Sequence, residues 1–105
     1  MGKLLSAALV LLITFPCFAI AEVSSARQAE LRHLLKHDCG SCHGMTLKGG
    51  LGPALTSDVL QKKSRQMLLV TILEGRPGTP MPPWKTLLTN DEVNWLLERL
   101  IKGDG

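Results

Sequence analysis

The segment Cys-Gly-Ser-Cys-His at residues 39–43 limits what this 105-residue chain can fold into more than any other feature. Two thiols two residues apart, followed at once by an imidazole, form the C-x-x-C-H pattern of c-type haem attachment. We therefore expect Cys39 and Cys42 to form thioethers with the vinyl groups of one haem c per chain. Because this tether holds the porphyrin beside the next residue, His43 is the expected axial ligand of the iron.

Two other chemistries use paired cysteines at this spacing, and the rest of the chain argues against both. A thioredoxin-like redox site would lie in a βαβ unit, and no alternating strand pattern is present. A structural zinc site usually draws four ligands from two pairs, whereas no second pair follows residue 43. The motif therefore favours haem attachment.

The first 21 residues have the layout of a secretory signal peptide. Lys3 precedes an apolar run over residues 4–13, and residues 19–21 (Ala-Ile-Ala) provide the small side chains of a cleavage site. An uncleaved anchor is the alternative, because the apolar segment is borderline in length for a membrane span, although Pro16 interrupts it. We expect cleavage before residue 22, a periplasmic location, and one domain of residues 22–105 that is not held at a membrane.

That domain has few large side chains with which to fill a core. Phe15 and Phe18 both fall in the signal segment, there is no Tyr, and only Trp84 and Trp95 remain. Small domains usually need a disulfide, a metal or a cofactor for stability. A porphyrin in the core would supply the missing aromatic volume.

The charge of the chain excludes one class of function. The signal segment holds one of the 12 basic residues and none of the 9 acidic residues, which leaves 11 basic and 9 acidic side chains. Nucleic-acid-binding domains are normally far more basic. We expect no nucleic-acid partner.

Capping signals predict an all-α domain with three main helices. A capping box at Ser25-Ala-Arg-Gln28 is expected to open the first helix, which extends toward Cys39. Ser57 is expected to cap a short turn. The second helix should run from Ser64 to Gly75, and the third from a capping box at residues 89–92 to Gly103. Residues 48–53 and 76–84 are rich in Gly and Pro and should form loops.

Met81 is the strongest candidate for the second axial ligand. It lies between Pro80 and Pro82, in a segment whose φ angles are largely preset. A thioether in such a loop can reach an iron with little ordering cost. Other candidates remain at this point: Met67, which a helix would more often use for packing, and His33 or His37, which would give bis-histidine ligation.

Pro53 has a separate expected role. An axial histidine normally donates its second ring N–H to a carbonyl or carboxylate, which fixes the orientation of the ring. The backbone carbonyl of Pro53 is the best candidate for that acceptor. The alternative is that Gly52-Pro53 forms only a turn.

Together the motifs resemble those of a known family. C-x-x-C-H-G, then G-P-x-L, then M-P-P and a capped last helix are similar to the class I monohaem c-type cytochromes, over residues 26–102. The longer string CGSCHGMTLKGGLGPAL…ILEGRPGTPMPPW resembles cytochrome c-55X of denitrifying bacteria. The resemblance implies ligation by His43 and Met81, Pro53 as the acceptor for His43, and electron transfer.

One departure from the class I pattern concerns the contact between the first and last helices. Many class I cytochromes place a glycine and an aromatic residue where those helices cross. Leu31 and Arg99 occupy these positions here, and Trp95, one turn earlier, is the candidate aromatic residue.

The expected function is electron transfer rather than catalysis, since two axial ligands leave no open position on the iron. We expect a monomer. The resemblance implies that it donates electrons to a redox protein partner, nitrite reductase. An assembly factor in maturation of the d1 haem of that enzyme is the alternative, and a haem sensor or peroxidase-like enzyme is a third. Some of the basic residues are expected to surround the exposed haem edge as a docking ring: Lys48, Lys62, Lys63, Arg65, Arg76 and Lys85.

Overall fold

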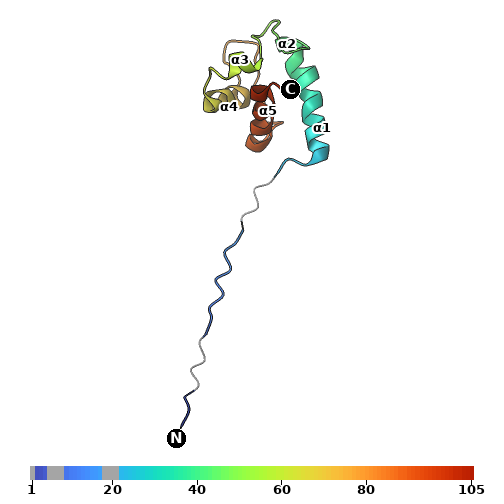
Figure 1. The fold of residues 1–105 in the computed structure, drawn as a ribbon. Coiled ribbons are helices and arrows are strands. Elements are labelled where there is room, and N and C mark those ends of the chain that lie inside the picture. The colour runs from blue at the N-terminus through green and yellow to red at the C-terminus, as the bar shows by residue number, and fades with distance from the viewer. Residues whose placement is uncertain (1, 5–8, 18–21) are drawn as a thin grey trace.

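The computed structural model describes residues 2–4, 9–17 and 22–105. Within these residues every regular element is helical and none is a strand, which confirms the predicted all-α class. The elements are α1 (Ser25–Leu34), the π-helical turn η1 (Leu35–Cys39), α2 (Gly40–His43), α3 (Ser57–Leu60), α4 (Arg65–Glu74) and α5 (Asn90–Lys102). Figure 1 shows α1 and α2 on one side of the domain, with α3, α4 and α5 beside them.

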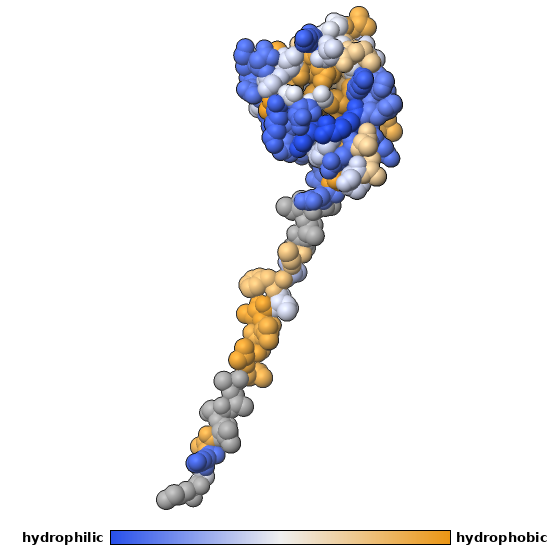
Figure 2. Space-filling view, turned by 45° about the vertical axis from the view of Figure 1, so that its right-hand side comes forward, coloured by the Kyte–Doolittle hydropathy of each residue, from blue (hydrophilic) through white to orange (hydrophobic). Residues whose placement is uncertain are grey.

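The N-terminal segment lies apart from these helices. Residues 9–17 form no helix or strand, and their apolar side chains are exposed, as the hydrophobic stretch in Figure 2 shows. Among the residues that can be described, no helix has both the length and the apolar character needed to cross a membrane. The expected cleavage site at residues 19–21 lies outside the described residues.

α1, η1 and α2 form one unbroken helical rod from Ser25 to His43. The predicted capping box at Ser25 is wrong by one residue. Ser24 is the N-cap, because its backbone is extended and its Oγ accepts the N–H of Arg27 at 3.2 Å. The amide of Gln28 instead donates to the carbonyl of Val23 at 2.9 Å.

α4 and α5 begin and end where their caps predict. The hydroxyl of Ser64 accepts the N–H of Met67, and Gly75 ends α4 with a φ of 70°. Thr89 and Glu92 form the predicted capping box of α5, and Gly103 closes that helix in the left-handed conformation. The short helix α3 differs from its prediction. Thr56 is its N-cap, and the side chain of Ser57 donates to the carbonyl of Ile101 in α5.

The apolar core lies between α1 and the inner face of α5. Leu31 and Val93 are fully buried there. Trp95 packs against this core as the partly buried aromatic residue of α5. The guanidinium groups of Arg32 and Arg99 each lie 5.3 Å from its ring. The core between α1 and α5 therefore contains Leu31 where many class I cytochromes have a glycine, and Trp95 is the aromatic residue that packs against it.

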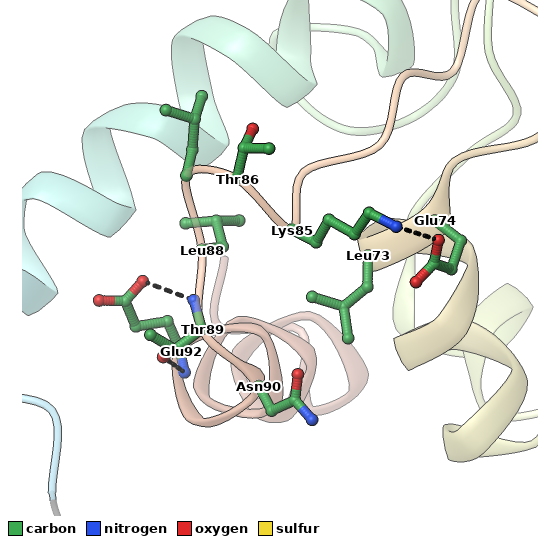
Figure 3. A pocket seen from close by; sticks show the side chains of 9 residues that line it. Leu73, Glu74, Lys85, Thr86, Leu88, Thr89, Asn90 and Glu92 are labelled. Carbon is green, nitrogen blue, oxygen red and sulfur yellow. Dashed lines mark hydrogen bonds and ion pairs between the residues drawn. The ribbon is translucent and has the colours of Figure 1, made fainter.

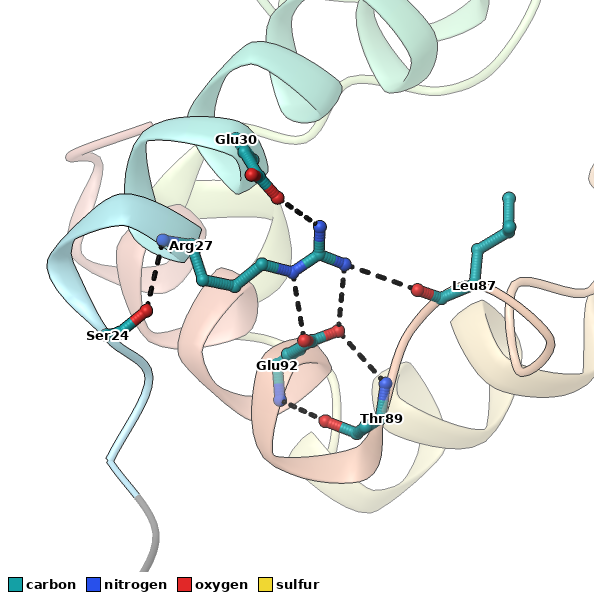
Figure 4. A network of polar contacts seen from close by, with 6 residues as sticks. All are labelled: Ser24, Arg27, Glu30, Leu87, Thr89 and Glu92. Atoms are coloured by element: carbon teal, nitrogen blue, oxygen red, sulfur yellow. Dashed lines mark hydrogen bonds and ion pairs between the residues drawn. The ribbon is translucent and has the colours of Figure 1, made fainter.

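An ion-pair network ties the N-terminal end of α1 to that of α5 (Figure 4). The guanidinium of Arg27 donates to both carboxylate oxygens of Glu92, at 2.9 and 3.2 Å, and to Glu30 at 2.6 Å. The same Glu92 carboxylate accepts the backbone N–H of Thr89. The Glu92 carboxylate thus takes part both in the capping box of α5 and in the ion pair that links α5 to α1.

Candidate functional site

A cavity of about 790 Å³ lies between η1 and α2 on one side and α3, α4, α5 and the loops beside them on the other. Its walls are mainly leucines of η1, α3, α4 and α5, together with Val59, Ile72 and Trp84. All four predicted haem contacts, Cys39, Cys42, His43 and Met81, line this one cavity. Figure 2 shows hydrophobic residues in the middle of one face of the domain, with hydrophilic residues around them.

His43 is held in one orientation by the loop that follows it. Its Nδ1 lies 2.7 Å from the carbonyl oxygen of Pro53. A carbonyl can only accept, so Nδ1 carries the proton and donates. In the neutral imidazole this leaves the lone pair on the other ring nitrogen, Nε2, which is the form that ligates a metal. This contact places Pro53 where the sequence predicts the acceptor of His43.

Glycines let this loop approach the end of α2 closely. The N–H of Gly52 donates to the carbonyl of Cys42 at 2.7 Å, and that of Gly49 donates to the carbonyl of His43 at 2.8 Å. A Cβ on Gly52 would lie 2.8 Å from Nδ1 of His43, and one on Gly50 would lie 2.8 Å from the carbonyl oxygen of Cys42. Side chains at these two positions would displace the imidazole or the end of the helix.

The loop that carries Met81 is anchored to the C-terminal end of α4. The carbonyl of Met81 accepts the N–H of Arg76 at 3.1 Å, and its own N–H donates to the hydroxyl of Thr79. The N–H of Trp84 donates to the carbonyl of Ile72, which ties the far end of the loop to the same helix. These hydrogen bonds and the three flanking prolines restrict the backbone of the loop that places the Met81 thioether at the cavity.

The two motif cysteines are free thiols rather than a disulfide. Burial raises the pKa of the Cys39 thiol to about 11, and the charge of Asp38 adds to this effect. The thiol is therefore protonated and weakly nucleophilic at neutral pH. Reactive thiols of disulfide redox sites have lowered pKa values instead.

The predicted basic residues around the haem edge do not all lie at the cavity. Lys63 and Arg76 line the cavity. Arg65 donates to Asn94, and Lys85 forms an ion pair with Glu74 at 2.8 Å. Lys63 and Arg76 are therefore the best-placed cations for contacts at the opening of this cavity.

The alternative candidates for the second axial ligand differ in whether they line the cavity. Neither His33 nor His37 lines the cavity, so the structure does not support bis-histidine ligation by either of them. Met67 lines the cavity but is 46% exposed, unlike a core residue. Met81 is the methionine that lies in the anchored loop.

A second hollow of about 430 Å³ lies between the end of α4 and the start of α5 (Figure 3). Its residues include the Lys85–Glu74 ion pair and the Thr89–Glu92 capping box. None of the predicted haem contacts lines it.

The donors and the shape of the larger cavity fit a covalently attached haem. The chain leaves a large apolar space that its own side chains do not fill. Two thiols stand on one wall, beside an imidazole whose Nδ1 is bonded to the carbonyl of Pro53, and a thioether lines the same space. Gly52 leaves room for that imidazole where a Cβ would not.

Two features of the site were not predicted from the sequence. The helix before the motif contains the π turn η1, and the backbone N–H of Arg76 donates to the carbonyl of Met81. No local sequence signal distinguishes a π turn from the α-helix around it. Arg76 was predicted only as one of the basic residues around the haem edge, and it does line the cavity.

Comparison with known proteins agrees with this site. A family model described as cytochrome c oxidase, cbb3-type, subunit III, matches residues 26–98. The chain is 54% identical to cytochrome c55X of Pseudomonas aeruginosa over 100 residues, covering 91% of this chain and 84% of the relative. It is 48% identical to cytochrome c55X of Stutzerimonas stutzeri over 99 residues, covering 94% and 88%.

A solved structure agrees with the fold as well. The c-type cytochrome NirC superimposes with a TM-score of 0.75 at 59% identity, covering 77% of this chain and 95% of that chain. The all-helical architecture and the cavity beside the C-x-x-C-H motif are thus those of a small class I cytochrome c domain. The chain belongs to the cytochrome c55X family of c-type cytochromes and carries one haem c.

Proposed function

We propose that this protein is a periplasmic one-electron carrier, formed by residues 22–105 after removal of residues 1–21. The observation that supports this most is the pairing of an oriented imidazole with an anchored thioether around one cavity, His43 and Met81. With both as axial ligands, the iron has no position left for a substrate. Such a site suits electron transfer rather than catalysis.

The residues of the chain have distinct roles in this proposal. Cys39 and Cys42 hold the haem covalently, and the haem iron supplies the one-electron redox couple. The Nδ1–H group of His43 donates a hydrogen bond to the carbonyl of Pro53, which fixes the ring so that Nε2 can act as the ligand. The Met81 thioether raises the reduction potential relative to a second histidine. Leu68 of α4 and three leucines of α5 give the site apolar walls.

We further propose that the partner is the dissimilatory nitrite reductase, as the resemblance to cytochrome c-55X implies. Lys63 and Arg76 line the cavity and stand where they can contact an approaching partner or the haem propionates. Encounters between redox proteins are small and transient. A modest local charge is therefore enough to orient the two proteins.

The test is stopped-flow mixing of reduced holoprotein with oxidised nitrite reductase. We expect second-order oxidation of the haem c, followed by turnover when nitrite is added. Carbon monoxide should not bind the reduced holoprotein quickly, because Met81 occupies the sixth position. Absence of electron transfer to the mature enzyme, with transfer to enzymes of d1 haem synthesis instead, would support the assembly role. Rapid carbon monoxide binding would favour a sensor or peroxidase-like protein.

A further inference from the structure

Two histidines stand together on the outside of the helical rod, away from the haem cavity. His33 lies near the end of α1 and His37 in the middle of η1, and both are exposed. Their ring centroids are 4.2 Å apart, with the planes tilted by 37°. Neither lines the cavity, so the proposed electron-transfer site uses neither of them.

The change of helix type brings the two rings into register. In an α-helix, residues four apart are rotated by about 40° beyond one full turn. A π turn contains more residues per turn, so four residues fall short of a full turn. The junction of α1 and η1 lies between His33 and His37. The over-rotation of the α-helical part and the under-rotation of the π-helical part about the helix axis therefore partly cancel. The imidazoles therefore project from the same line along the rod.

Paired imidazoles in this arrangement are good ligands for a metal ion. Two histidines four residues apart on one helical face hold zinc in H-E-x-x-H sites. Imidazole suits Zn²⁺, Ni²⁺ and Cu²⁺, with metal–nitrogen distances of about 2.0–2.1 Å. The two ligating nitrogens then lie roughly 3 Å apart, by the tetrahedral geometry usual for zinc. Ring centroids 4.2 Å apart permit this after small rotations of two exposed side chains.

We propose that His33 and His37 form a second metal site on this protein, for one divalent ion of the later first-row metals. No third His, Cys, Asp or Glu completes a three-residue group within the ranges that the structure describes. Water therefore fills the remaining positions, and the ion exchanges readily. Cu²⁺ binds most tightly by the Irving–Williams order. An ion bound to the folded state stabilises it, by an amount that grows with the metal concentration.

The site can be tested by isothermal titration of the tag-free oxidised holoprotein with Ni²⁺, which does not exchange electrons with the haem. We expect one Ni²⁺ per chain. His33→Gln and His37→Gln should each weaken binding at least tenfold, since a single imidazole loses the chelate. Lys36→Gln, which changes the exposed residue between them, is the matched control and should bind as tightly as wild type. The haem spectrum of every variant should match wild type, which shows that folding and haem loading are intact.

Two results would overturn the proposal. One is a wild-type holoprotein that binds no Ni²⁺ at millimolar concentration. The other is a His33→Gln/His37→Gln double variant that binds Ni²⁺ as tightly as wild type, which would place the metal elsewhere on the chain.

Discussion

Met81 is the residue whose replacement should change the electronic properties of the site most. Met81→Ala removes the proposed sixth ligand, so we expect a lower reduction potential and rapid binding of carbon monoxide or imidazole. Axial ligands together set haem potentials over a range of about 0.8 V, so the shift should be readily measurable. A spectroelectrochemical titration of the purified variant measures it. The methionine–iron charge-transfer band near the red edge of the oxidised spectrum should also disappear.

Met45 provides the control for this change. It is also a methionine and is 55% exposed, but it does not line the cavity. Met45→Ala should keep the wild-type potential and spectrum. If Met81→Ala does so as well, Met81 is not the ligand, and Met67 becomes the next methionine to replace.

Gly52 offers a test of how His43 is oriented. A Cβ at this position would lie 2.8 Å from Nδ1 and 2.9 Å from Cε1 of His43. We expect Gly52→Ala to displace the ring from Pro53 and to destabilise the holoprotein by about 1–3 kcal/mol, as overpacking does. Chemical denaturation followed at the haem band measures this loss.

Gly40→Ala is the matched control, because its Cβ would meet neighbours only at 3.5 Å and beyond. An alanine there should leave the free energy of unfolding close to wild type. Equal losses for the two variants would show that crowding of His43 is not the cause.

Single residues were predictable where their chemistry is local. The C-x-x-C-H spacing indicates haem by itself, and the prolines around Met81 indicate a rigid loop. Pro53 was predicted because an axial histidine needs an acceptor, and its carbonyl lies 2.7 Å from His43. The partners of Arg27 were not predictable, since Glu92 lies 65 residues away and the contact exists only after α1 and α5 pack.

At the scale of the helices, caps were the reliable signal. The caps of α4 and α5 form bonds within three residues, so the sequence contains all that is needed to predict them. Two adjacent serines left the start of α1 ambiguous, and backbone conformation selected Ser24. The π turn η1 was missed because its residues carry no sequence signal that separates them from the α-helix around them.

The junction of α1 and α5 should depend on pH through Glu92. The hydrogen bonds from Arg27 hold the pKa of this carboxyl below its ordinary value, the backbone N–H of Thr89 adds to the effect, and burial opposes it. The pKa is lower in the folded state than in the unfolded state. The stabilisation from the Arg27–Glu92 pair is therefore fully present at pH values above the pKa of Glu92 in the unfolded chain, about 4.3. It is lost as the pH falls through the folded pKa.

Glu92→Gln tests this junction. The variant keeps the shape of the side chain but loses its charge. We expect the free energy of unfolding of the holoprotein to fall by about 1 kcal/mol at pH 7, a modest figure because the Arg27 side chain is 34% exposed and solvent screens the pair. The difference from wild type should shrink below about pH 4, as wild-type Glu92 becomes protonated. Urea unfolding at several pH values measures both effects.

Glu98→Gln removes the exposed ion pair with Lys102 and should change stability less than Glu92→Gln. A Glu92→Gln difference that does not change with pH would show that packing, and not charge, links the helices.

For the whole molecule, the haem is expected to be a requirement for folding. The domain leaves a largely apolar space of about 790 Å³ that its own side chains do not fill. Without the haem, the leucines around this space lose most of their packing partners, and small domains have little stability to spare. We therefore expect Cys39→Ala/Cys42→Ala to give a haem-free chain that is degraded or lacks a cooperative thermal transition by circular dichroism. A sharp transition matching that of the holoprotein would contradict this.

Partner choice depends on where charge lies rather than on its total. The domain carries 11 basic and 9 acidic side chains, and two ionised haem propionates bring the molecule close to neutral. Long-range attraction is then weak, and steering must come from local clusters. Lys62 and Lys63 form such a cluster, and Lys63 also lines the cavity. Reversing the charge of these two lysines therefore tests whether local charge steers the partner.

The measurement is the second-order rate of electron transfer to nitrite reductase, by stopped flow, over a range of salt. Salt shortens the screening length to roughly 8–10 Å, so the wild-type rate should fall as salt rises. Lys62→Glu/Lys63→Glu should be tenfold or more slower at low salt, with an unchanged potential. Lys36→Glu/Lys102→Glu makes the same change of net charge outside the cavity lining and should be slowed less. If the wild-type rate does not depend on salt and both double variants match it, apolar contacts around the haem edge control docking instead.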